Sequence, residues 1–288
     1  MKILLLGKNG QVGWELQRTL APLGDVIALG RQELDLTDQQ SIRRTVRTTR
    51  PDLIVNAAAY NAVDKAEEEP ELAMAINGIG PGILAEEAVL NKALIVHYST
   101  DYVFDGAKDS PYTEEDIPNP LNIYGKTKLA GEEAIRKTEA GYLILRTCWV
   151  YGLRGNNFLL TILRLAREKN ELRIVNDQFG APTWSRMVAE STALLLARYL
   201  FSKPEHSKKG LYHLSADGET TWFGFTRAIL EQIEKDRKHT PILQAISTES
   251  YPTAATRPLF SVLDNNLIHE QFAITMPSWQ KQLKLAIS

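Results

Sequence analysis

Short apolar runs alternate with amphipathic stretches along the first 150 residues of the chain. The runs at residues 3–6, 26–29, 53–56 and 93–98 have the length of buried strands, and helical patterns separate them. Strands that are apolar throughout, with helices between them, are typical of a parallel sheet covered on both faces. The pattern therefore predicts an α/β fold with a doubly wound parallel sheet.

The first apolar run ends in a glycine turn. Gly7, Gly10 and Gly13 follow one another at three-residue steps before a helical pattern begins. In such a turn Gly7 lets the backbone bend, Gly10 lets a pyrophosphate approach, and Gly13 lets the helix pack close to the strand. The N-terminus of the helix then offers unpaired N–H groups to phosphates. The turn predicts a Rossmann-like dinucleotide site, although a tight turn without a ligand has the same spacing.

The pattern changes after about residue 150. We expect residues 1–150 to form an NAD(P)-binding domain and residues 151–288 to form a smaller α/β substrate-binding domain. A segment at about 172–200 is expected to pack back on the first domain, and residues 203–210 read as a polar connector. The expected elements of this half are helices at 158–169, 187–201 and 222–233 and strands at 172–175 and 211–214.

Two segments at predicted strand ends bear on a cofactor. Gly30 and Arg31 follow the second strand, where an acid would bind a ribose 2′-hydroxyl and an arginine can pair with a 2′-phosphate. Arg31 therefore favours NADPH, although a plain surface arginine is the competing interpretation. Ala57, Ala58 and Ala59 follow the third strand and leave room for a flat group, or alternatively for a helix.

Candidate catalytic groups follow the fourth strand. Thr100 lies at its end, and Tyr124 and Lys128 are four residues apart at the start of a helical pattern, so they share one face. A nearby ammonium favours the phenolate form of a tyrosine, whose pKa is otherwise about 10. The hydroxyl of Thr100 could position a carbonyl oxygen at the same point.

Composition narrows the function further. The 288 residues are 44 % hydrophobic and 24 % charged with a net charge of −2, which argues against a nucleic-acid partner. There is no apolar stretch of membrane-spanning length, so no membrane is expected, and the single cysteine, Cys148, suits the cytoplasm. The five histidines show no metal-ligand spacing, so no metal ligands are predicted.

Seven segments, in order along the chain, resemble the extended short-chain dehydrogenase/reductases, and within them the dTDP-4-dehydrorhamnose reductase family. The segments are GKNGQVG at 7–13, NAAAYNAVDKAE at 56–67, YSTDYVFDG at 98–106, PLNIYGKTKLAGE at 120–132, RTCWVY at 146–151, NDQFGAPT at 176–183 and RP at 257–258. The resemblance implies NAD(P)H-dependent reduction of the C4 ketone of dTDP-4-dehydro-6-deoxy-L-mannose to dTDP-L-rhamnose. This is the last step of dTDP-rhamnose synthesis for cell-surface polysaccharide.

The resemblance also implies roles for individual residues. Thr100, Tyr124 and Lys128 would be catalytic, with Tyr124 as proton donor. The cofactor would contact Gly7, Gly10, Gln11, Val12, Gly13, Gly30, Arg31, Asp35, Leu36, Ala57, Ala58, Ala59, Tyr98, Tyr124 and Lys128. The substrate would contact Thr100, Asp101, Trp149, Asn157, Gln178, Thr183 and Arg257. For the last four residues, ordinary loop hydrogen bonding is the alternative, although an arginine suits a phosphate well. The resemblance also allows a homodimer and a Mg²⁺ ion.

Two other functions remain open from the sequence. The chain could reduce a different nucleotide 4-keto sugar, or it could be a non-catalytic NADP-binding regulatory subunit of the same fold. The Ser-Thr-Asp and Arg-Thr-Cys-Trp segments speak against the first alternative. The complete set of Thr100, Tyr124 and Lys128 speaks against the second, because a binding subunit has no use for it.

Overall fold

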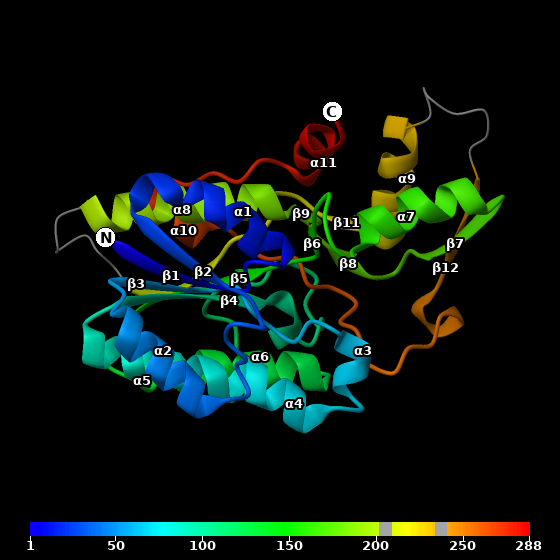
Figure 1. Cartoon of the computed structure of the whole chain (residues 1–288). Coiled ribbons are helices and arrows are strands. Elements are labelled where there is room, and N and C mark those ends of the chain that lie inside the picture. Colours follow the sequence, from blue (N-terminus) through cyan, green and yellow to red (C-terminus); the bar gives the residue numbers. More distant parts are fainter. Residues whose placement is uncertain (202–208, 234–240) are drawn as a thin grey trace.

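The computed structural model of the protein describes residues 1–201, 209–233 and 241–288. A six-stranded parallel sheet with the order β10-β5-β4-β3-β1-β2 lies at its centre (Figure 1). The strands are β1 (Lys2–Leu6), β2 (Asp25–Leu29), β3 (Leu53–Asn56), β4 (Leu94–Thr100), β5 (Gly141–Thr147) and β10 (Gly210–His213). The predicted α/β class and the doubly wound parallel sheet are confirmed.

Helices cover both faces of this sheet (Figure 1). On one face lie α1 (Gln11–Thr19), α8 (Ser185–Phe201) and α10 (Asn266–Phe272), and on the other lie α2 (Gln39–Thr49), α5 (Gly80–Asn91) and α6 (Ile123–Arg136). Successive side chains of a strand point to opposite faces. In β1, Ile3 and Leu5 therefore join the α1 and α8 core, whereas Leu4 and Leu6 join the α2 and α5 core. The uniformly apolar strand sequences follow from this double burial.

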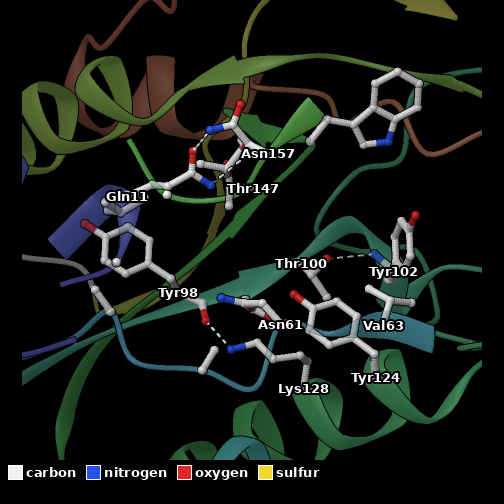
Figure 2. Close-up of a pocket in the computed structure, with 18 of the residues that line it drawn as sticks. Gln11, Asn61, Val63, Tyr98, Thr100, Tyr102, Tyr124, Lys128, Thr147 and Asn157 are labelled. Carbon is white, nitrogen blue, oxygen red and sulfur yellow. Dashed lines mark hydrogen bonds between the residues drawn. The ribbon is translucent and has the colours of Figure 1, made fainter. Parts of the chain in front are cut away.

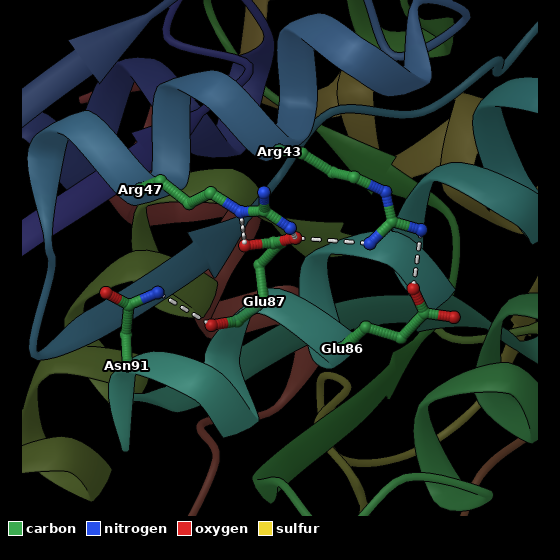
Figure 3. Close-up of polar contacts among 5 residues, drawn as sticks. All are labelled: Arg43, Arg47, Glu86, Glu87 and Asn91. Atoms are coloured by element: carbon green, nitrogen blue, oxygen red, sulfur yellow. Dashed lines mark hydrogen bonds and ion pairs between the residues drawn. The ribbon is translucent and has the colours of Figure 1, made fainter.

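An ion-pair cluster joins α2 to α5 (Figure 3). The buried carboxylate of Glu87 accepts two hydrogen bonds from Arg47, at 2.7 and 2.8 Å, and one from Arg43 at 3.1 Å. Arg43 also reaches the exposed Glu86 at 2.7 Å. Two guanidinium groups thus compensate a carboxylate that is shielded from water, as buried charges require.

The second half of the chain has its own core. It is built from α7 (Phe158–Glu168), α9 (Trp222–Ile233) and α11 (Trp279–Ile287), together with three two-stranded sheets. These sheets pair β6 (Val150–Tyr151) with β9 (Thr183–Trp184), β8 (Phe179–Gly180) with β11 (Thr220–Thr221), and β7 (Glu171–Val175) with β12 (Ile242–Ile246). The short helices α3 (Val63–Ala66) and α4 (Pro70–Met74) precede a π-helical turn (Ala75–Ile79) that leads into α5.

The chain crosses between the two halves more than once after residue 150. Helix α8 packs on α1, and β10 extends the central sheet beside β5, whereas β7 lies in the second half. The predicted domain boundary at residue 150 stays a prediction, and residues 203–208 of the predicted connector lie outside the described residues. No described helix combines the length and apolar character needed to cross a membrane.

Candidate active site

A pocket of about 530 Å³ opens at the carboxyl ends of the central strands. The helices that follow β1 and β2 lie on opposite faces of the sheet, so the pocket sits where ligands bind in open α/β folds. Most predicted site residues line it. They are Gly10, Gln11, Val12, Ala57, Ala58, Ala59, Tyr98, Thr100, Asp101, Tyr124, Lys128, Trp149 and Asn157.

The glycine turn forms one end of the pocket. Gly7 adopts a left-handed conformation with φ of 84°, and a Cβ on Gly13 would lie 2.1 Å from the carbonyl oxygen of Gly7. These two glycines thus shape the turn without lining the pocket. Gly10 is the N-cap residue of α1, and no side chain among the described residues caps this end of the helix. The backbone N–H groups of the first helical turn therefore remain open to the pocket.

We expect Gly13→Ala to lower the free energy of unfolding by about 1–3 kcal/mol, the usual cost of overpacking. The atom that the new methyl group meets is backbone, so it cannot turn aside. Urea denaturation measures the loss. Gly141→Ala is the matched control, since its Cβ would meet the Leu94 side chain at an ordinary 3.5 Å. Equal stability of the two variants would contradict this account of the turn.

A loop from the second half closes on this turn. The side-chain amide of Asn157 donates to Oε1 of Gln11 at 2.9 Å and to the carbonyl oxygen of Gly152 at 2.9 Å. Its own oxygen caps α7 by accepting from the N–H of Leu160 at 3.1 Å. Asn157 therefore stabilises its loop and also lines the pocket. Both interpretations from the sequence, loop hydrogen bonding and substrate contact, are compatible with this position.

Thr100, Tyr124 and Asp101 meet in the centre of the pocket. The cap of α6, where the N–H of Gly125 donates to Asn122 at 2.8 Å, places Tyr124 in the first helical turn. Figure 2 shows the hydroxyl of Tyr124 directed toward Thr100. Thr100 in turn donates to a carboxylate oxygen of Asp101 at 3.0 Å. Burial raises the pKa of Tyr124 to about 12, and hydrogen bonding with Thr100 opposes that rise.

Lys128 lies one helical turn from Tyr124, as the spacing predicts. Its ammonium group donates to the carbonyl oxygen of Tyr98 at 2.5 Å (Figure 2). The same nitrogen lies 3.4 Å from Nε2 of His97. Burial lowers the pKa of Lys128 to about 8. The sequence predicted that Lys128 would lower the pKa of Tyr124. The structure differs, because the Lys128 ammonium points at a backbone oxygen and the burial of Tyr124 raises its pKa. The phenol keeps its proton and is suited to donate it.

A buried polar group beside these residues was not predicted from the sequence. Thr147 ends β5 next to Thr100, with which it is in register on β4. Its hydroxyl oxygen is buried, lines the pocket and has no hydrogen-bond partner among the described residues. Unpaired buried hydroxyls are rare. Thr147 thus offers a hydrogen-bonding group to whatever fills the pocket.

Two tryptophans wall the side of the pocket that faces the second half. Trp149 stacks on Trp222 with ring centroids 3.5 Å apart and planes at 7°. Gly180 makes room for this arrangement, since a Cβ there would lie 2.4 Å from the Trp149 ring. Trp149 was predicted to contact a hexose. Trp222 was missed, because in sequence it reads as the start of an ordinary amphipathic helix.

The remaining unpredicted lining residues neighbour predicted ones. They are Asn9, Asn61, Val63, Ser99, Tyr102, Val150, Gly155 and Asn156. Several lie inside the segments that carry the family resemblance, so the segments were the available signal for them.

Residues predicted at the adenosine end lie outside the pocket lining. The Arg31 side chain is 74 % exposed and pairs with Asp35 at 3.4 Å, while Asp35 also accepts from Thr37 at 2.9 Å. Leu36 is buried in the core on the α2 and α5 face. Gly30 directly follows β2, as expected.

Three predicted substrate residues bind other parts of the chain. Gln178 accepts from Trp222 and donates to Thr248, both at 3.1 Å. Thr183 is fully buried and bonds to the backbone of Ala181 and Ala216, both at 2.9 Å.

Arg257 forms a two-pronged ion pair with Asp64, at 2.7 and 3.0 Å. None of Gln178, Thr183 and Arg257 lines the pocket.

Within the described part of the chain, no cluster of three or more histidine, cysteine or acidic side chains is arranged to hold a metal ion.

Comparison with known proteins agrees with this geometry. The family model described as "RmlD substrate binding domain" matches residues 1–288. The chain is 48 % identical to dTDP-4-dehydrorhamnose reductase of Escherichia coli strain K12 over 99 % of its length and 96 % of that protein. It is 46 % identical to the protein of the same name from Burkholderia thailandensis, over 100 % of this chain and 98 % of that protein.

Solved structures give the same result. The crystal structure of dTDP-4-dehydrorhamnose reductase from Bacillus anthracis in complex with NADP has a TM-score of 0.92 at 35 % identity. The match covers 99 % of this chain and 98 % of that one. The family resemblance carried by the seven sequence segments is thereby confirmed. The chain belongs to the RmlD family, that of the dTDP-4-dehydrorhamnose reductases.

Proposed function

We propose that the protein reduces the C4 ketone of dTDP-4-dehydrorhamnose to give dTDP-L-rhamnose, with NADPH or NADH as the reductant. One observation carries the proposal. Thr100, Tyr124 and Lys128 line a single pocket that also contains the open end of the glycine turn. Two relatives that this chain matches over 96 % and 98 % of their length are reductases of that substrate by name.

The pocket residues fit a nicotinamide dinucleotide. Gly10, Gln11 and Val12 present the uncapped start of α1, which suits a pyrophosphate. Three alanines after β3 leave a flat, small-residue wall, and the unpaired hydroxyl of Thr147 can bond a polar group of the cofactor or substrate. When bound, such a cofactor supplies the hydride that reduces the ketone.

The protein supplies the proton and stabilises the charge that develops on the C4 oxygen. Tyr124 holds its proton at neutral pH because burial raises its pKa to about 12, so its O–H can be donated to the nascent alkoxide. Thr100 lies beside that hydroxyl, and its own proton is donated to the Asp101 carboxylate at 3.0 Å. When the substrate binds, we expect Thr100 to turn this proton from Asp101 to the C4 oxygen and so to orient that oxygen.

Lys128 stabilises the phenolate that remains. Its buried ammonium lies on the same helical face as Tyr124, and the carbonyl oxygen of Tyr98 holds it in place. In surroundings of low dielectric constant, such a fixed charge acts strongly on a nearby anion. By resemblance to the family, the same ammonium would also bind the ribose of the nicotinamide. The stacked Trp149 and Trp222 form an apolar wall against which the hexose can lie.

The decisive experiment follows NADPH absorbance while dTDP-4-dehydrorhamnose is added to the purified protein. We expect substrate-dependent oxidation, with much slower oxidation when a UDP- or GDP-linked 4-keto sugar replaces the substrate. Equal rates with those sugars would favour a reductase of another nucleotide sugar. Binding of NADPH without oxidation would favour a regulatory subunit.

The location and assembly of the protein stay predictions. A cytoplasmic enzyme is expected from the sequence. The resemblance to the family allows a homodimer and, on that ground alone, a Mg²⁺ ion.

A further inference from the structure

A charged corner lies between the glycine turn and the end of β2. The N–H of Gly30, the residue that follows β2, donates to Oε2 of Glu33 at 2.8 Å. The other carboxylate oxygen of Glu33 pairs with the ammonium of Lys8, which belongs to the glycine turn. This pairing holds the pKa of Glu33 below its ordinary value, so the carboxylate is charged at neutral pH. One carboxylate thus links two backbone segments.

The carboxylate of Glu33 lies close to the space that a side chain at position 30 would occupy. A Cβ on Gly30 would lie 2.7 Å from the side-chain amide of Asn9 and 3.1 Å from Oε2 of Glu33. Asn9 lines the pocket, so this corner adjoins the cavity. In NAD-binding folds an acidic residue near the end of the second strand accepts the 2′-hydroxyl of the adenosine ribose. Here the carboxylate of Glu33, which lies three residues beyond Gly30 in sequence, occupies the place of that acidic residue.

The same corner holds positive charge. The ammonium of Lys8 is 27 % exposed in its side chain, and Arg31 is 74 % exposed with only a long contact to Asp35. A 2′-phosphate carries about −1.5 to −2 charges, which a lone carboxylate would repel and two cations would attract. Lys8 is therefore able to exchange its partner, from the carboxylate of Glu33 to a phosphate.

We propose that the Lys8–Glu33 pair sets the preference of the enzyme between NADH and NADPH. Glu33 accepts the free 2′-hydroxyl of NADH, whereas Lys8 and Arg31 bind the 2′-phosphate of NADPH. Glu33 attracts the 2′-hydroxyl of NADH and repels the 2′-phosphate of NADPH, whereas Lys8 and Arg31 attract that phosphate, so neither cofactor is excluded. The inference rests on the proposed use of a nicotinamide dinucleotide but does not depend on which sugar is reduced.

The test measures binding of the adenosine half alone. Calorimetric titration with 2′,5′-ADP and with 5′-AMP, which differ only in the 2′-phosphate, gives a ratio of affinities for each variant. We expect Glu33→Gln to shift this ratio about ten-fold toward 2′,5′-ADP, and Lys8→Met to shift it about ten-fold toward 5′-AMP, as removal of one charge near a phosphate implies. Glu168→Gln, in an exposed pair with Arg164 on α7, is the control and should leave the ratio unchanged.

Opposite shifts for Glu33→Gln and Lys8→Met, with wild-type unfolding temperatures, support the inference. Unchanged ratios in variants that still bind both nucleotides overturn it and leave the proposed reductase intact. A wild-type protein that binds neither nucleotide overturns the inference and the proposed cofactor together. Failure of sugar reduction in the absorbance experiment leaves these titrations unaffected.

Discussion

Tyr124→Phe should lower turnover by about two to four orders of magnitude, the usual contribution of a general acid, while NADPH affinity stays close to wild type. The substitution removes one oxygen atom and keeps the ring that packs edge-on against Tyr102, with centroids 5.8 Å apart. Thr100 cannot replace the lost acid, because loss of its proton would leave an alkoxide beside the buried Asp101 carboxylate, which accepts its hydrogen bond. Turnover is measured by NADPH oxidation, and affinity by quenching of tryptophan fluorescence.

The control is Tyr142→Phe on β5, which removes a phenolic oxygen outside the pocket lining. It should keep wild-type turnover. A Tyr124→Phe enzyme with near-wild-type turnover would remove Tyr124 from the mechanism and would leave the proton to come from another group.

Glu132→Gln should cost about 3–5 kcal/mol of unfolding free energy, the range for breaking a buried ion pair. Glu132 on α6 and Arg146 on β5 are joined by two hydrogen bonds of 2.9 and 2.6 Å, and their side chains are 0 % and 2 % exposed. Ser99 donates to the same carboxylate at 2.5 Å. Without the negative charge, the Arg146 guanidinium would stay buried with no counter-ion. Urea denaturation measures the loss.

Two further variants separate charge burial from a general effect of substitution. Glu86→Gln removes a carboxylate that is 54 % exposed, so its ion pair with Arg43 should contribute only about 0–1 kcal/mol (Figure 3). The double variant Glu132→Gln, Arg146→Met should be more stable than Glu132→Gln alone, because it removes the uncompensated cation. A double variant less stable than the single one would show that packing of Arg146 over Phe104, at 5.0 Å, matters more than its charge.

Local sequence patterns were enough to predict most of the central sheet. The strand at 53–56 matches β3 in both bounds, and the helix expected at 222–233 begins at the same residue as α9. These elements can be recognised in the sequence because a strand buried on both faces is apolar throughout, and because a helix with one buried face has apolar residues at helical spacing. The pairing of β7 with β12 and the return of β10 to the sheet edge were not predictable, since each joins segments far apart in the chain.

The site shows the same division between local and distant information. The glycine turn and the spacing of Tyr124 and Lys128 are local, and the structure brings both to the pocket. Arg257 suits a phosphate in sequence, yet the structure pairs it with Asp64 across a separation that no local pattern encodes. Lys8 and Glu33 likewise become a pair only when β1 and β2 lie side by side.

The crossing of the chain between its two halves has a consequence for synthesis on the ribosome. The core on the α1 face contains Leu16 and Leu20 from the start of the chain, Leu196 from α8, and Ile268 and Phe272 from α10. During translation the glycine turn emerges first, but its helix is not covered until α8 (Ser185–Phe201) has been made, and the core is not complete until residues near 272 follow. Contacts of such long range are formed late and slowly. A nascent chain therefore exposes apolar surface for most of its elongation.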